Sequence, residues 1–221
     1  MRRGFVLRSK MLALVGVALL ASCTSREPKR QPNQSIPDAR EASDAPDPAA
    51  PLAAAAPSEG AIGSAALPEL SERHVDDRYG YELAFPRGWT ASEGAAMPAL
   101  FVASARESSS DAFVENVNVV VEALPTTLSA EDYADGSAPL LQTDLSEYRE
   151  LSRTTVELAG QPAVRLEYQH TYQGHPLWVV SYMLVAGPRA YVITATAEQS
   201  QLDRWRAPLD AIARSFRLTS G

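Results

Sequence analysis

The 221-residue chain is long enough for one ordinary domain together with additional segments. It carries 20 Lys and Arg against 27 Asp and Glu, which gives a formal net charge of −7 at pH 7. This acidic balance argues against general nucleic-acid binding, which needs a basic surface, and against an electrostatic attachment to anionic lipid.

Residues 1–22 have the features of an export signal. Basic side chains cluster in residues 2–10, and residues 11–20 form an apolar run that is too short to span a bilayer comfortably. The run ends in Leu-Ala-Ser-Cys at residues 20–23, which resembles the bacterial lipobox. The resemblance implies cleavage before Cys23, a diacylglyceryl thioether on its sulfur and an acylated new N-terminus. Lipid attachment at Cys23 is the one site that we predict.

The alternative for this segment is an ordinary secretory signal that contains a cysteine by chance. Cys23 is the only cysteine of the sequence, so no internal disulfide can form. Acyl chains would anchor the protein almost permanently, since each buried CH₂ contributes about 0.8 kcal/mol. Thr24 follows the cysteine, and in lipoproteins of the enterobacterial type a residue other than aspartate there suits release to the outer membrane. We therefore expect a lipid-anchored protein of the bacterial cell envelope, at the outer membrane and facing the periplasm.

Residues 23–74 are predicted to be a disordered tether. Proline recurs, alanine, serine and acidic residues fill much of the rest, and aromatic residues are absent. Such a composition has too little apolar bulk to offset the chain entropy lost on folding. The tether would span on the order of 40 Å on average. The alternative is that part of it is a specific docking peptide.

Residues 75–221 are expected to form one domain with a single core, because a chain of this length buries about two-thirds of its unfolded surface. Alternating or continuous apolar runs, separated by Gly- and Pro-containing turns, indicate seven strands. The strands are expected at residues 79–85, 100–105, 116–124, 148–158, 162–173, 177–186 and 190–197. In the strand at 162–173, Val164 and its alternate neighbours should be buried, and the opposite parity, which includes Arg165 and Glu167, should face water.

Two helices are expected between and after these strands. The first is capped by Ser129, and Gly136 and Pro139 should kink or break it. The second begins at Ser200 and carries an apolar stripe with three- and four-residue spacing. Pro208 should split it into a short turn and a second helix. The stripe consists of Leu202, Trp205, Leu209, Ile212 and Phe216.

This order of elements predicts the α+β class, with a mainly antiparallel sheet of about six to seven strands covered by helices. Short cues resemble the PsbP-like superfamily: aromatic-Pro-x-Gly-Trp at residues 85–89, Leu-x-Gly-x-x-Ala at 158–163 and Ser-Phe at 215–216. That superfamily includes the extrinsic PsbP protein of photosystem II, the Mog protein of nuclear transport, and DcrB-like and LpqN-like bacterial lipoproteins. The resemblance covers most of residues 79–218 and implies an α/β/α sandwich. Its members do unrelated jobs, so it implies no particular activity.

No catalytic, cofactor-binding or metal-ligating residue is assigned. His170 is expected to be a partly buried strand histidine with a hydrogen-bond partner, and His74 is expected to be solvated. A metal site would need further ligands, such as Glu167 and His175, and no ligand-spacing motif is present. The chain also has no Gly-x-Ser-x-Gly elbow and no Gly-rich phosphate loop. The tryptophans Trp89, Trp178 and Trp205 are expected in core or helix–sheet packing; alternatively, some of them line a hydrophobic groove.

The first functional hypothesis is a non-enzymatic, membrane-anchored module that binds another envelope protein or assists assembly of an envelope complex. It predicts an unidentified protein partner, membrane attachment through the lipid alone, a monomeric state, no cofactor and no nucleic acid. The alternative is a carrier or sensor of a small apolar ligand held between sheet and helix. A third hypothesis is a hydrolase built on His170 and His175.

Overall fold

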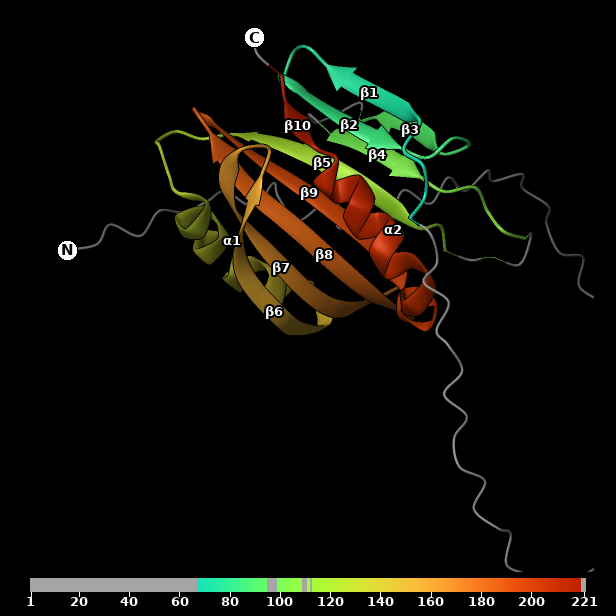
Figure 1. Ribbon diagram of the computed structural model, residues 1–221. Helices are drawn as coiled ribbons and strands as arrows, with labels where there is room; N and C mark the ends of the chain where they lie inside the picture. The colour runs from blue at the N-terminus through green and yellow to red at the C-terminus, as the bar shows by residue number, and fades with distance from the viewer. Residues whose placement is uncertain (1–66, 95–98, 109–110, 112, 220–221) are drawn as a thin grey trace, which may run out of the picture. The chain divides into compact units, whose positions relative to one another are not determined.

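The computed structural model describes residues 67–94, 99–108, 111 and 113–219, which form two antiparallel sheets and two α-helices (Figure 1). The expected export signal, Cys23 and most of the expected tether lie outside these residues. The larger sheet has the spatial order β3 (Thr90–Glu93), β4 (Ala99–Ala103), β5 (Asn116–Ala123), β9 (Arg189–Glu198), β8 (His175–Ala186), β7 (Gln161–Tyr172) and β6 (Ser146–Leu158). The smaller sheet has the order β1 (Glu72–Asp76), β2 (Tyr81–Phe85) and β10 (Arg217–Leu218).

The seven-stranded sheet is covered on both faces, and each face has its own hydrophobic core. Helix α1 (Ala130–Asp144) packs against β6, β7 and β8 on one face. Helix α2 (Leu202–Arg214) and the small sheet pack together on the other face (Figure 1). The predicted α+β fold, with a mainly antiparallel sheet covered by helices, is confirmed.

The last four strands of the large sheet in chain order form a meander of long hairpins. Two of its turns need a left-handed backbone at both central residues, which matches the twist of the flanking strands. These turns are Ala159-Gly160, with φ of 54° and 71°, and Gln173-Gly174, with φ of 50° and 85°. Glycine adopts this conformation without the penalty of a Cβ atom. Because of the turn at Gln173-Gly174, β7 ends at Tyr172 and β8 begins at His175, two residues before the expected start at residue 177.

Helix α1 begins where the sequence predicts. The Ser129 hydroxyl accepts a hydrogen bond from the Asp132 backbone N–H at 3.0 Å, which satisfies one of the free donors of the first turn. The expected break is wrong, because the helix runs through Gly136 and Pro139 to Asp144. Tyr133, which is fully buried, donates to Glu122 on β5 at 2.8 Å and attaches the helix to the sheet.

Helix α2 differs from its prediction in two respects. Its N-cap is Gln201, after the short 3₁₀ helix η2 (Gln199–Gln201), and Ser200 lies inside η2 and makes no cap hydrogen bond. The helix is also continuous through Pro208. Proline removes a single intrahelical bond to the carbonyl four residues earlier, which here belongs to Arg204 in the first turn. Apolar side chains before and after Pro208 pack on the same core, so the helix continues through the proline.

The cues that resemble the PsbP-like superfamily have structural roles. Phe216 is fully buried and stacks on Tyr81 with ring centroids 5.5 Å apart. Ser215 donates to the Ala84 carbonyl at 2.9 Å and accepts from the Ala84 N–H at 3.0 Å, so the end of α2 is joined to β2. Gly88, with φ of 85°, turns the chain between β2 and β3. These cues therefore hold the small sheet against α2.

Three short strands, β1, β3 and β10, lie outside the predicted set. β1 places His74 opposite Leu83 on β2, and the side chain of His74 is 17% exposed. The expectation of a solvated His74 is therefore wrong. Neither helix of the described chain is long and apolar enough to cross a lipid bilayer.

Candidate functional site

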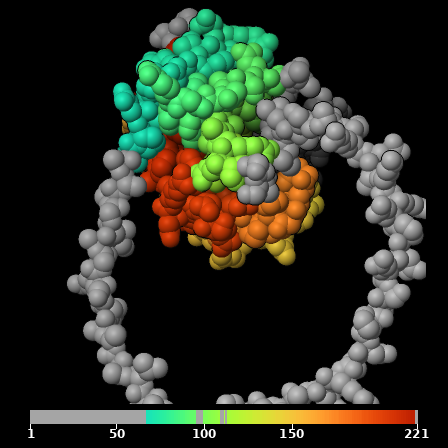
Figure 2. Space-filling model, turned by 90° about the vertical axis from the view of Figure 1, so that its right-hand side faces the viewer, coloured from blue at the N-terminus to red at the C-terminus, as the bar shows by residue number. Residues whose placement is uncertain are grey.

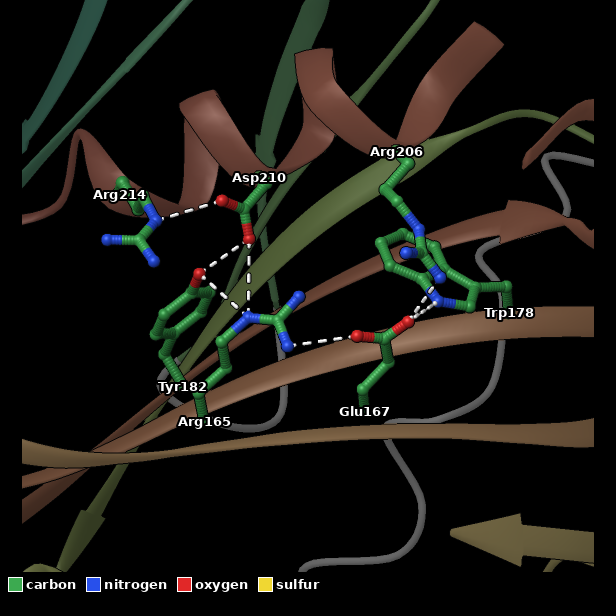
Figure 3. Close-up of polar contacts among 7 residues, drawn as sticks. All are labelled: Arg165, Glu167, Trp178, Tyr182, Arg206, Asp210 and Arg214. Carbon is green, nitrogen blue, oxygen red and sulfur yellow. Dashed lines mark hydrogen bonds and ion pairs between the residues drawn. The ribbon is translucent and has the colours of Figure 1, made fainter. Parts of the chain in front are cut away.

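A buried carboxylate lies where helix α2 packs on the large sheet. Glu167 on β7 is 6% exposed and faces α2 (Figure 3). Its Oε1 accepts hydrogen bonds from the Trp178 indole on β8, at 2.7 Å, and from Arg206 on α2, at 2.5 Å. Its Oε2 accepts one from Arg165, at 2.9 Å. Glu167 thus joins two neighbouring strands to the helix through three donors.

The surroundings of Glu167 favour its charged form. Burial by itself would raise the pKa of Glu167. Hydrogen bonds from Trp178 and Arg165, together with the positive charge of Arg206, outweigh burial and hold the pKa below its ordinary value. A carboxylate that stays ionised and has both oxygens occupied is poorly suited to proton transfer at neutral pH.

A second carboxylate continues the network along the helix. Asp210 accepts from the Tyr182 hydroxyl at 2.5 Å and from Arg214 Nε at 2.8 Å. Arg165 Nε lies 3.6 Å from the Asp210 carboxylate and donates to the Tyr182 oxygen at 3.2 Å. Burial, and then the bond to Asp210, raise the pKa of Tyr182 to about 12, so its hydroxyl remains a donor.

We name this network the α2 clamp. It consists of Arg165, Glu167, Trp178, Tyr182, Arg206, Asp210 and Arg214 (Figure 3). Its helix members, Arg206, Asp210 and Arg214, are four residues apart and share one face of α2. Each acid is paired within the fold, so the clamp fixes the helix on the sheet and presents no free acid or base.

Surface hollows lie away from the clamp carboxylates. One of about 370 Å³ is lined by α1 and β6, and another of about 370 Å³ by the β6–β7 turn with Arg214 and Arg217. A third, of about 360 Å³, is lined by Pro176 and residues 198–200. Their walls carry charged side chains and open widely to solvent, unlike the largely enclosed, apolar sites that hold small ligands.

His170 lies on the opposite face of β7 from Glu167. It is 3% exposed, and neither ring nitrogen has a hydrogen-bond partner in the described part of the chain. Its ring centroid lies 6.1 Å from that of Tyr168. Burial lowers the pKa of His170, and the neighbouring Thr171 backbone, which acts to raise it, opposes this only in part. The expectation of a partly buried histidine with a hydrogen-bond partner is therefore wrong.

Glu115 is a second buried ionisable residue outside the clamp. It precedes β5 and is 4% exposed. Burial, and then the nearby charges of Asp111, Glu107 and Glu198, raise the pKa of Glu115 to about 7. Figure 2 shows the segment around it, in yellow-green, between red α2 and an orange part of the meander. Arg204 on α2 contacts this segment through an ion pair with Glu107.

The structure does not bring the histidines together with Glu167 into a metal site. His175 Nδ1 lies 2.7 Å from Glu198, at a partly exposed position. Within the described ranges, no group of three or more His, Cys, Asp or Glu side chains is arranged to hold a metal ion. Cys23, the predicted lipid attachment site, lies outside the described residues.

The tryptophans pack in the fold, as the first of the two expectations for them states. Trp178 is fully buried. Trp89 and Trp205 pack edge to face with ring centroids 5.9 Å apart, which joins the β2–β3 turn to α2. None of the three lines the hollows described above.

The sequence pattern does not predict the α2 clamp, because alternation places Arg165 and Glu167 on the solvent-exposed face of their strand. Two signals point to it. One is a strand that carries opposite charges two residues apart. The other is the charged row Arg206, Asp210 and Arg214 beside the apolar stripe of a helix. Neither signal shows that the two rows face each other.

Comparison with known proteins decides the family. The DcrB family model matches residues 100–215, which is more than half of the chain and includes every residue of the α2 clamp. The chain belongs to the DcrB family. No curated protein matches it in sequence.

The DcrB-family domain is similar in fold to two solved structures. Cyanobacterial PsbP (CyanoP) from Synechocystis sp. PCC 6803 has a TM-score of 0.52 and 18% identity, over 72% of this chain and 99% of CyanoP. LpqN of Mycobacterium tuberculosis has a TM-score of 0.53 and 14% identity, over 63% of this chain and 83% of LpqN. The family match confirms the predicted DcrB-like relationship, and at these identities the two structures show that the fold is PsbP-like and LpqN-like.

Replacing Glu167 should destabilise the DcrB-family domain strongly. In Glu167→Gln, the partly buried Arg165 loses the carboxylate of Glu167, and breaking such a pair costs roughly 3 kcal/mol. Urea unfolding of the full chain measures the loss. The matched control is Glu157→Gln at an exposed position of β6, which should change the free energy of unfolding by less than about 0.5 kcal/mol. Equal stabilities for the two variants would contradict the role of the clamp.

His170 should make the domain sensitive to acid. Its pKa is lower in the folded chain than the ordinary 6.5, so the unfolded chain binds the proton first. The contribution of His170 to stability is therefore fully present above the ordinary pKa and is lost as the pH drops below it. In His170→Phe, the melting temperature should fall less between neutral and acid pH than in the unsubstituted chain. His175→Gln is the control and should keep the full acid sensitivity.

Glu115 should have the opposite effect on stability. Its folded pKa of about 7 lies above the ordinary 4.5, so the folded chain retains a proton that the unfolded chain has released. The contribution of Glu115 to stability should be fully present below pH 4.5 and decrease up to about pH 7, by at most roughly 3 kcal/mol. Glu115→Gln should remove this decrease in unfolding experiments across the interval. If exposed Glu150→Gln removed it as well, the assignment to Glu115 would fail.

Proposed function

We propose that this chain is a non-enzymatic, lipid-anchored lipoprotein of the bacterial envelope whose DcrB-family domain binds another envelope protein or assists its assembly. The observation that carries the proposal is the α2 clamp. The buried Glu167 and the partly buried Asp210 are paired within the fold and rigidify it. A fixed scaffold of this kind suits recognition through its surface.

The anchor in this proposal is Cys23. The Leu-Ala-Ser-Cys sequence at residues 20–23 follows a basic start and a short apolar run, and this combination supports cleavage before Cys23 and lipidation of its sulfur. The predicted Pro- and Ala-rich tether would then connect the lipid to the domain. LpqN, which shares the fold, is described as involved in cell envelope biogenesis, and this agrees with an envelope setting.

The proposed anchor predicts the behaviour of a single variant. Cys23→Ala should move the protein from the membrane fraction to the soluble fraction and abolish incorporation of a labelled fatty acid, because the acylated sulfur is absent. Ser25→Ala is the matched control and should remain in the membrane and labelled. A Cys23→Ala protein that stayed in the membrane fraction would contradict the proposal.

A further inference from the structure

The large sheet ends in a long strand with an open edge. β6 (Ser146–Leu158) is the outermost strand on its side, and in the described part of the chain no strand pairs with its outer edge (Figure 1). The strand at the opposite edge, β3, has four residues, whereas β6 has thirteen. An exposed edge of this length offers unpaired backbone N–H and C=O groups to another chain.

Irregular pairing protects the N-terminal half of β6 against the addition of another strand, and the C-terminal half lacks this protection. Register shifts between Ser146 and Arg149 and between Glu150 and Ser152 disturb its pairing with β7, and Glu147 has a left-handed φ of 55°. Irregularities of this kind discourage the addition of another strand. From Ser152 to Leu158 the register is regular and the segment contains no proline. This half of β6 is therefore ready to accept a strand.

The face of the sheet beside α1 is acidic at this edge. Thr155 donates to Glu131 on α1 at 3.0 Å, and Arg153 donates to Asp135 at 2.6 Å, so both strand side chains lie on the α1 side. These four residues line a hollow of about 370 Å³. The sequence has no basic residue between Arg106 and Arg149, so the exposed acids of α1 are in excess.

The opposite face carries arginines at the same edge. Arg214 and Arg217 line a hollow together with residues 157–160 of the β6–β7 turn. Arg217 donates to the backbone carbonyls of Arg214 and Phe216, and no carboxylate pairs with it in the described ranges. A strand added beside β6 would place alternate side chains over these two oppositely charged faces.

We propose that residues 152–158 of β6 form a docking edge for an extended segment of a partner protein. The segment adds as an eighth strand, with basic side chains toward α1 and acidic side chains toward Arg214 and Arg217. This assignment rests on the proposed binding function and names the surface that performs it. Charge complementarity favours a partner over a second copy, because β6 itself would present Thr154, Val156 and Leu158 to the arginines.

A peptide experiment tests the edge directly. The probe is an acetylated eight-residue peptide with alternating lysine and glutamate, added to the ¹⁵N-labelled full chain in detergent micelles at low salt. The largest amide shifts should fall in residues 152–158. A peptide with the same composition in two blocks, and an alternating peptide N-methylated at every second residue, should each bind about tenfold more weakly or less. Equal binding of all three peptides, or shifts confined to other elements, would overturn the proposal.

A charge-reversal variant tests whether the acidic side chains of the peptide lie near Arg217. Arg217→Glu should weaken the alternating peptide about tenfold, because it places a carboxylate opposite the glutamates of the peptide. Arg204→Glu makes the same change at the distant end of α2, where Arg204 pairs with Glu107, and should leave binding within about twofold. An unchanged amide spectrum outside the substituted region shows that each variant is folded. Equal losses in both variants would refute the assigned edge.

Photocrosslinking in cells distinguishes failure of this surface from failure of the proposed function. A photoreactive amino acid replaces Thr154 on β6 or, as a matched position, exposed Arg87 in the β2–β3 turn. Crosslinks from position 154 to a segment with alternating basic and acidic side chains support the proposal. Crosslinks from position 87 alone, or to a second copy from position 154, overturn the docking edge and leave the binding function standing. Crosslinks from neither position overturn both.

Discussion

The described fold depends on a buried carboxylate held by three donors. Glu167 accepts from Arg165 on its own strand, from Trp178 on the next strand and from Arg206 on α2. A buried charge is tolerated only when it is fully paired, so each donor must keep its place. The position of α2 on the sheet is therefore fixed by a polar constraint as well as by the apolar stripe beneath it.

Around this constraint the sheet separates two surfaces of different charge. The α1 side is rich in acidic side chains. Tyr133 of α1 is buried in the core on this side and donates a hydrogen bond to Glu122. The α2 side carries arginines, several of which form ion pairs with Glu167 and Asp210. The two surfaces meet at the free edge of β6, where an added strand would contact both. The fold thus has a rigid centre, and the proposed docking edge lies at its margin.

Much of the fold could be predicted from the sequence, because the strands have local signatures. Alternation and left-handed Gly turns place the meander, and Ser129 caps α1. The breaks that proline was expected to cause are absent from both helices. Pro139 and Pro208 each remove one helical hydrogen bond, and packing on the sheet outweighs that local cost. The candidate site was missed, because the environment of Glu167 is created by a helix about 40 residues away in sequence.

The sequence by itself determined the class of fold, the order of its main strands and the family resemblance, since these follow from periodicity, turn residues and short packing motifs. It also carries a pattern around Cys23 that resembles a lipobox. Only the tertiary structure decided that β7 is buried on both faces, that His170 lacks a hydrogen-bond partner in the described chain, and that β6 is left at an edge. The physical reason is that burial, pairing and exposure of a side chain depend on which distant segment covers it.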